Sequence, residues 1–461
     1  MGKKGKVNVK TVQIYKGKKM KKVALHNLGC KVNSYEIDVM QQMLQKNGYE
    51  IVDFEQKADI YIVNTCSVTS IADKKSRQML HKAKKNNPDS IVIAVGCYVQ
   101  TGTETILKDE GIDLAIGNNK KKDLVEILEQ YLLEKGMHTE DKTLHDTTII
   151  DINHTNEYEE MTLEQTAEHT RAYIKIQDGC NQFCTYCIIP YARGRVRSRK
   201  KEDIINEIKG LVERGYKEVV LTGIHISSYG TDFGQAGLLD LIQSIHNIDG
   251  ICRIRLGSLE PRIVTEEFAT ELSKLPKVCP HFHLSLQSGA KETLKRMNRH
   301  YTPGEYLKGV EELRRAFDNP AITTDVIVGF PGETEEEFEE TRLFLEKIKL
   351  YEMHIFKYSI RTGTIAAKMP NQVKDTVKSV RSDILLDMEE RFSREYREMY
   401  VGREVSVLFE EEKEILGQKY QIGHTCQYVK VAYQTDKDLS NQIVSGKVTR
   451  LLTNDVLLME D

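Results

Sequence analysis

The chain has 461 residues, of which 40% are apolar, and its formal net charge at pH 7 is -3. This length exceeds one small core and can bury a large apolar surface, so a disulfide-stapled miniprotein is excluded. Uninterrupted apolar runs stay well short of the roughly 20 residues that a membrane-spanning helix needs, so we expect no membrane association.

The first part of the chain has a basic start followed by strands that alternate with helices. Residues 1–20 hold many lysines and little apolar periodicity, which predicts a basic disordered tail; a nucleic-acid-binding arm is the alternative. Residues 21–135 should form one domain, with buried strands at 22–28, 59–64, 90–95 and 112–117. This alternation predicts a parallel sheet, because right-handed crossovers place the helices on the faces of the sheet.

A second alternating series follows a polar segment. Residues 136–165 are polar and acidic, and we interpret them as a linker with one strand in "TTIIDI". Residues 166–397 should form a second domain, with strands at 172–177, 218–223, 252–258, 282–287, 323–330 and 352–359. Six such units favour a partial (β/α)6 barrel over a complete eight-fold barrel.

The pattern changes again near the C-terminus. A long charged helix is predicted to end at Gly402, and short runs of alternating apolar residues follow it. These runs predict a small all-β barrel of the OB type over residues 398–461, a shape that often binds RNA. The expected fold class is therefore α/β: a parallel-sheet N-terminal domain, a partial barrel and a small β-barrel.

The loop "GCNQFCTYC" (179–187) places Cys180, Cys184 and Cys187 close together after the first barrel strand. We expect a cytoplasmic protein with reduced thiols, in which grouped cysteines indicate metal or redox chemistry. A structural zinc site and a ferredoxin cluster both need four protein ligands, and the loop supplies only three. Three thiolates leave one iron of a [4Fe–4S] cluster open to another ligand.

Three further cysteines, Cys30, Cys66 and Cys97, each follow the end of a predicted strand in the first domain. The ends of parallel strands converge on one crevice, so these distant residues can meet. Buried structural cysteines would more often fall inside strands or helices. The pattern therefore predicts a second cluster.

The cysteine loop resembles the signature of radical S-adenosylmethionine (SAM) enzymes. In that superfamily the open iron binds SAM, and an electron from the cluster cleaves SAM to methionine and a 5′-deoxyadenosyl radical. The turns "LTG", "GSLEP", "LSLQSG" and "VIVGFPGET" resemble later cofactor-binding strands of the superfamily. The resemblance implies that SAM contacts Tyr186, Gly223, Ser258, Glu260, Gln287, Val328 and Gly329.

Over residues 21–461 the arrangement resembles the methylthiotransferases, which carry a C-terminal TRAM domain. The resemblance implies two [4Fe–4S] clusters, a radical cluster on the loop cysteines and an auxiliary cluster on the other three. It also implies that one SAM methylates a sulfur on the auxiliary cluster. A second SAM then supplies the radical that takes hydrogen from the substrate carbon.

One branch of these enzymes is most similar in sequence to three segments of this chain, "LGCKVNSYE" (28–36), "IPYARGRVRSR" (189–199) and "LTGIHISSYG" (221–230). That branch adds a methylthio group to C2 of N6-threonylcarbamoyladenosine at tRNA position 37. The alternatives are the branch that acts on isopentenyladenosine, the branch that modifies a ribosomal protein, and a non-catalytic iron–sulfur RNA-binding protein. The implied partners are the tRNA anticodon stem-loop, a low-potential electron donor such as flavodoxin or ferredoxin, and a sulfur source.

Cations after the cysteine loop are the main candidates for tRNA contacts. Arg193, Arg195 and Arg197 could bind phosphates, although a solvated helix start would look the same. In the predicted TRAM domain, Tyr428 and Lys430 are expected to contact RNA. His225 is expected to line the substrate pocket, and a satisfied structural histidine is the alternative.

Overall fold

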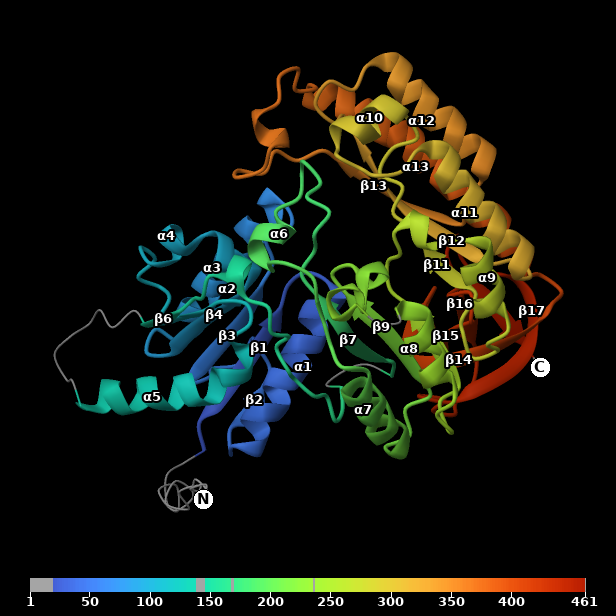
Figure 1. The fold of residues 1–461 in the computed structure, drawn as a ribbon. Coiled ribbons are helices and arrows are strands. Elements are labelled where there is room, and N and C mark those ends of the chain that lie inside the picture. The colour runs from blue at the N-terminus through green and yellow to red at the C-terminus, as the bar shows by residue number, and fades with distance from the viewer. Residues whose placement is uncertain (1–19, 138–145, 167–169, 235–236, 461) are drawn as a thin grey trace.

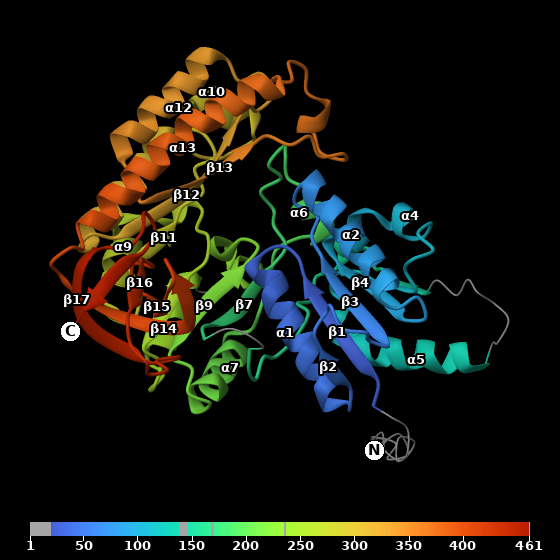
Figure 2. The ribbon, with the colours of Figure 1, turned by 180° about the vertical axis from the view of Figure 1, so that it is seen from behind.

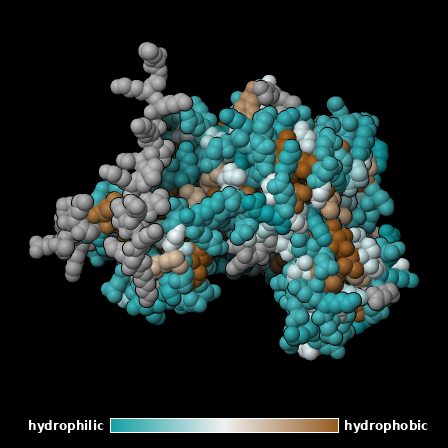
Figure 3. All heavy atoms as spheres, turned by 90° about the horizontal axis from the view of Figure 1, so that it is seen from below, coloured by the Kyte–Doolittle hydropathy of each residue, from teal (hydrophilic) through white to brown (hydrophobic). Residues whose placement is uncertain are grey.

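The computed structural model describes residues 20–137, 146–166, 170–234 and 237–460. Almost all of the predicted basic tail lies outside these residues. Figure 1 shows a parallel-sheet domain, a central half-open barrel and a small C-terminal barrel packed beside it. Within the described residues, no helix combines the length and the apolar character that crossing a bilayer demands. The face seen in Figure 3 is mainly hydrophilic, and its apolar side chains form separate patches.

The N-terminal sheet is parallel throughout, with strand order β2-β1-β3-β4-β5-β6. Its strands are β1 (Lys22–Asn27), β2 (Glu50–Val52), β3 (Ile60–Thr65), β4 (Ile91–Gly96), β5 (Leu114–Ile116) and β6 (Asp146–Thr148). Its helices are α1 (Lys31–Lys46), α2 (Ser70–Asn86), α3 (Cys97–Thr101), α4 (Thr103–Ile106) and α5 (Leu124–Met137). β3 and β4 are wholly buried, which explains their continuous apolar sequence. The strand expected in "TTIIDI" overlaps β6, which pairs with β5 and so extends this sheet rather than standing in a linker.

The central domain is a partial barrel of six parallel strands, as expected. Its strands are β7 (Ala172–Asp178), β9 (Glu218–Gly223), β10 (Arg253–Leu256), β11 (His281–His283), β12 (Ala321–Val328) and β13 (Glu352–Lys357). Single parallel bridges join the β10 side to the β11 side, and the short β8 (Arg197–Ser198) pairs antiparallel with β7. The barrel stays open because β13 is an edge strand.

Helices cover the outer face of the partial barrel. They are α7 (Lys201–Glu213), α8 (Leu238–His246), α9 (Glu266–Ser273), α10 (Lys291–Arg296), α11 (Pro303–Ala316), α12 (Glu335–Ile348) and α13 (Asp375–Glu398). The short α6 (Ile189–Ala192) instead packs against α3 of the N-terminal domain. α11 and α12 both begin with capping boxes, formed by Thr302 with Glu305 and by Thr334 with Glu337. These reciprocal bonds pair amide groups that a helix start leaves open.

The C-terminal domain is a closed barrel of β14 (Glu404–Ile415), β15 (Gln418–His424), β16 (Lys430–Tyr433), β18 (Leu457–Glu460) and β17 (Ile443–Leu451). Arg253 and Arg255 of β10 donate to backbone carbonyls of this barrel, including His424 O at 2.9 Å and Cys426 O at 2.8 Å. Both views show the barrel seated beside the first strands of the central domain (Figure 2). The expected α/β fold class, with a partial barrel and a small all-β barrel, is confirmed.

Candidate functional site

The loop after β7 brings three thiols to the wall of one cavity. Gly179 has φ +71°, and a Cβ at this position would lie 1.8 Å from the carbonyl oxygen of Arg195. Only glycine therefore fits before Cys180. The cavity beyond the loop has a volume of about 150 Å³ and is lined by Cys180, Gln182, Cys184, Tyr186, Cys187, Ile189, Ile224, His225, Ser258, Leu259, Glu260, Ser285 and Arg299.

The chemistry of these thiols fits a metal cluster. Burial raises the pKa of Cys180 to about 11 and that of Cys187 to about 12, and in both cases the neighbouring Cys184 adds to the rise. Cys180 and Cys187 are therefore neutral until a metal displaces their protons. Arg299 donates from Nη1 to the Cys184 Sγ at 3.3 Å, which places a cation beside the anionic thiolates of a bound cluster. Sequence reasoning missed Arg299, because "MNRHYT" carries no recognisable motif.

The residues expected to contact SAM divide into two groups. Tyr186, Ser258 and Glu260 line the cavity beside the cysteines. Gly223 ends β9, while Gln287 and Gly329 adopt left-handed backbone conformations (φ +69° at each) beyond the carboxyl ends of β11 and β12. Val328 is buried in the apolar core of the barrel. The second group lies near the ends of barrel strands but is not part of the cavity wall described above.

His225, predicted to line the substrate pocket, lines the same cavity as the loop cysteines. Its Nδ1 lies 2.7 Å from Ser228 Oγ, and its buried Nε2 has no hydrogen-bond partner among the described residues. Burial, followed by the charges of Arg299 and Arg262, lowers the pKa of His225 to about 4. His225 is therefore a neutral imidazole at physiological pH, with one ring nitrogen left for a ligand.

The other three cysteines converge at the carboxyl edge of the N-terminal sheet. Cys30 directly precedes α1, Cys66 follows β3, and Cys97 begins α3. Burial raises the pKa of Cys66 to about 11, and the neighbouring thiols of Cys97 and Cys30 add to that rise. Asn118 points its amide at the Cys97 Sγ from 3.6 Å. The fold therefore brings the three cysteines close together, as their positions after strand ends led us to expect.

Glycines stand directly before Cys30 and Cys97, at positions where neighbouring atoms come too close for a side chain. Gly29 has φ +110°, and a Cβ there would lie 3.0 Å from the Cys66 Sγ. Gly96 has φ +98°, and a Cβ there would lie 2.7 Å from Asn64 Oδ1. A side chain at position 29 would press on the Cys66 thiol, so glycine there leaves room for a group held beside it, whereas glycine at position 96 lets the turn close against Asn64 and Thr65 of β3.

A buried charge network lies between this edge and the partial barrel. Glu36 on α1 pairs with Lys121 at 2.7 Å, with Lys175 of β7 at 2.8 Å and with Arg193 at 2.8 Å. Lys175 and Arg193 also pair with Asp178, at 2.7 and 3.1 Å. With Arg197, 4.0 Å from Asp178, four buried cations thus face these two carboxylates, and a buried charge without a counterion is costly.

Thiolates at the auxiliary cysteines would provide the missing negative charge. The charge of Cys97 is the largest contribution that raises the pKa of Arg193 well above its ordinary value, against the opposing effect of burial. A cluster held by three thiolates would place anionic ligands beside this excess of cations. The donor set and the charge balance therefore both fit an iron–sulfur cluster at Cys30, Cys66 and Cys97.

The structure corrects the prediction of phosphate contacts for two of the three arginines after the cysteine loop. Arg193 and Arg197 are 0% and 1% exposed, and Arg193 is enclosed by Glu36, Asp178 and Asn33. Neither side chain can contact tRNA in this conformation, because both are buried in the interior of the protein. Arg195 is partly exposed, with its guanidinium 4.6 Å from the ring centroid of Phe183. Of the three arginines, only Arg195 stays a candidate for phosphate contact.

Tyr428, a predicted RNA contact, packs against the central domain, and its contact with RNA stays a prediction. Its ring stacks on His424 with centroids 4.4 Å apart, and the guanidiniums of Arg171 and Arg255 lie 4.7 and 4.8 Å from its centroid. His281 of β11 lies 5.2 Å away on the barrel side. Tyr428 therefore joins the C-terminal barrel to the central domain. Lys430 is exposed beside Asp455 and stays a candidate.

Comparisons with known proteins agree with this arrangement. Residues 174–345 match the Radical SAM superfamily, and residues 22–117 match the uncharacterized protein family UPF0004. The chain is 40% identical to the threonylcarbamoyladenosine tRNA methylthiotransferase MtaB of Bacillus subtilis, over 94% of each chain. It is 35% identical to the tRNA-2-methylthio-N(6)-dimethylallyladenosine synthase of Alkaliphilus oremlandii, over 96% of this chain and 94% of that one.

Among solved structures, the radical SAM methyltransferase TsrM from Kitasatospora setae, with cobalamin and a [4Fe–4S] cluster bound, has a similar fold. Its TM-score is 0.54 at 15% identity, covering 76% of this chain and 74% of TsrM. This similarity concerns the fold alone. It agrees with a partial barrel that follows a parallel-sheet domain.

Proposed function

The chain belongs to the radical SAM methylthiotransferase family, and from this premise we propose that it adds a methylthio group to C2 of N6-threonylcarbamoyladenosine at tRNA position 37. The observation that carries the proposal is the presence of two separate three-cysteine sets, each with a cation beside it: Arg299 near Cys184 and Arg193 near Cys97. One cluster would suffice for radical cleavage of SAM. The second set accounts for a reaction that also delivers sulfur.

The cofactors are two [4Fe–4S] clusters and SAM. When bound, the barrel cluster supplies the electron that cleaves SAM, and the auxiliary cluster carries the sulfur for transfer. Cys180, Cys184 and Cys187 would hold the first cluster, and Cys30, Cys66 and Cys97 the second. Radical chemistry suits the target, because C2 of adenine has a strong C–H bond and no acidic proton. Ordinary acid–base chemistry cannot open such a position.

The chain's own residues would position the two substrates around the cavity. We assign SAM to the end of the barrel lined by Tyr186, Ser258 and Glu260, with the turns at Gly223, Gln287 and Gly329 near the strand ends. The unpaired Nε2 of His225 faces a ligand as a neutral hydrogen-bonding atom. It suits the carboxylate or hydroxyl of a threonylcarbamoyl group better than an isopentenyl group, which has neither.

Several partners follow from this chemistry. The tRNA anticodon stem-loop would reach the site past Arg195 and, on the C-terminal barrel, Lys430. The open iron requires a low-potential electron donor such as flavodoxin or ferredoxin. A sulfur source must restore the auxiliary cluster after each turnover, and such a reaction belongs in the cytoplasm with the tRNA.

The substrate can be tested with matched tRNAs that carry either the threonylcarbamoyl or the isopentenyl modification. We expect kcat/KM to favour the threonylcarbamoyl form by a factor on the order of 10⁴, because the isopentenyl group would leave buried polar groups unpaired. Mass spectrometry of the digested nucleosides measures the product. Unmodified tRNA of the same sequence is the control.

Preference for the isopentenyl form would assign the chain to the alternative branch. It would leave the reaction class intact, because the cysteine sets do not depend on the modification at N6.

A further inference from the structure

Three potential metal ligands, none of them a cysteine, converge on adjacent strands of the central barrel. His283 ends β11, Asp325 lies within β12, and His354 lies within β13. Asp325 is paired directly with His354, and His283 is paired with Thr323, two residues before Asp325. Residues two apart on a strand share a face, so the three side chains point to the same side of the sheet.

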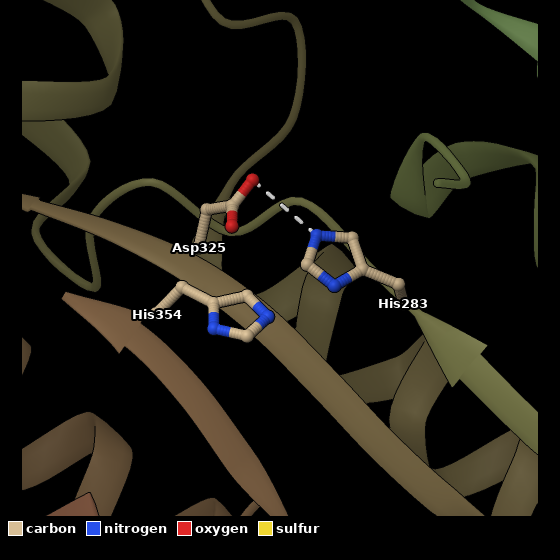
Figure 4. Close-up of side chains that lie close together, drawn as sticks. All are labelled: His283, Asp325 and His354. Atoms are coloured by element: carbon tan, nitrogen blue, oxygen red, sulfur yellow. Dashed lines mark ion pairs between the residues drawn. The ribbon is translucent and has the colours of Figure 1, made fainter. Parts of the chain in front are cut away.

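Their distances suit a shared ligand. One donor atom from each of the three residues lies within 4.8 Å of the others. The His283 Nε2 is 3.3 Å from Asp325 Oδ2, and the rings of His283 and His354 stack with centroids 5.8 Å apart (Figure 4). Within the described part of the chain, no hydrogen bond occupies the imidazole of His354. Ligand bonds of about 2.0–2.1 Å place two donors on one ion roughly 3–3.5 Å apart, so a small ion between these groups would draw the donors closer together.

A neighbouring hydroxyl orients His283 toward this point. The His283 Nδ1 lies 3.0 Å from Thr323 Oγ1. When Nδ1 donates its proton to that oxygen, the lone pair of Nε2 faces the Asp325 carboxylate. Two acceptors in this position repel each other unless a cation lies between them. Metal-binding histidines are commonly oriented by such a bond from the other ring nitrogen.

Exposure and ligand type indicate what could bind. The side chains of His283 and Asp325 are 15% and 30% exposed, and His354 is exposed, so an ion could enter from solvent. Two imidazoles and one carboxylate form the set that binds zinc in several hydrolytic enzymes and non-haem iron(II) in oxygenases. Such a set fills three positions and leaves others open to water or to a substrate oxygen.

We propose that His283, Asp325 and His354 bind one divalent transition-metal ion, of the zinc or iron(II) class, separate from both clusters. The ion would tie the edge strand β13 to β12 and β11 on the open side of the barrel. It would present at least one open coordination position to an oxygen ligand. Metal binding at this site does not depend on which tRNA modification is the substrate.

Zinc provides the test, applied to protein that already holds both iron–sulfur clusters so that the cysteines are occupied. The cluster-loaded protein is incubated anaerobically with Zn²⁺, desalted, and analysed for zinc and iron. We expect one zinc per chain in the unaltered protein and none above background in Asp325→Asn or His354→Gln, with unchanged iron content. X-ray absorption at the zinc edge should show only nitrogen and oxygen neighbours, at about 2.0–2.1 Å.

His81→Gln is the matched control, because His81 forms a pair with Asp109 at 2.8 Å that lacks a second histidine. It should bind zinc like the unaltered protein. His354 lies on an exposed edge strand, so His354→Gln tests the site without a large disturbance of the core. Sulfur neighbours at about 2.3 Å, zinc retained equally by all variants, or no retained zinc in the unaltered protein would each overturn the proposal.

Discussion

Replacing Cys180, Cys184 and Cys187 together with alanine should abolish both SAM cleavage and methylthio product. The three thiols line one cavity with the residues assigned to SAM, and without them no open iron is held there. Iron should fall from about eight to about four atoms per chain, because only the auxiliary cluster remains. Chromatography of 5′-deoxyadenosine and elemental analysis measure the two effects on the same sample.

Replacing Cys30, Cys66 and Cys97 separates the roles of the two sets. This variant should also lose about four iron atoms, but it should still form some 5′-deoxyadenosine while making no methylthio nucleoside. Cys252→Ala, at an exposed cysteine outside both sets, should behave like the unaltered protein. Methylthio product from either triple variant would contradict the two-cluster assignment.

Glu36→Gln is expected to cost about 3–5 kcal/mol of folding free energy, because it removes one partner from a fully buried ion network. The substitution keeps the shape of the side chain, removes the carboxylate that pairs with Lys121, and leaves Lys175 and Arg193 paired with Asp178. Anaerobic urea unfolding, followed by circular dichroism, measures the shift of the first transition.

Glu50→Gln is the control in the same domain. Glu50 forms an exposed ion pair with Lys22 at 3.8 Å, and exposed pairs contribute at most about 1 kcal/mol. If Glu36→Gln were no less stable than Glu50→Gln, the network would not hold the first domain against the barrel.

Most of the fold could be predicted from the sequence because each domain has a distinct hydrophobic period. Continuous apolar runs such as 59–64 and 90–95 are typical of strands buried on both faces, and they became β3 and β4. The convergence of Cys30, Cys66 and Cys97 followed from their places just past strand ends, because parallel strands share one carboxyl edge. A strand was predicted within 136–165, but the short β6 carried too little apolar pattern to show that it joins the first sheet.

The burial of charged residues could not be predicted, because it depends on partners far away in the sequence. Arg193 lies in a run of cations that resembles a solvated helix start, yet its main partner, Glu36, is 157 residues away. One signal was present: Glu36 lies four residues from Val32 and from Met40, so it shares the apolar face of α1. A carboxylate on that face indicated a buried cation. Arg299 gave no comparable signal.

The most direct measurement of the central claim uses tRNA whose N6-threonylcarbamoyladenosine carries deuterium at C2. The cluster-loaded enzyme is given this tRNA, SAM and a low-potential reductant, and the mass of the released 5′-deoxyadenosine is determined. The account predicts one deuterium in 5′-deoxyadenosine for each methylthio nucleoside formed, because the radical takes the hydrogen from C2. Methylthio product accompanied by unlabelled 5′-deoxyadenosine would contradict it.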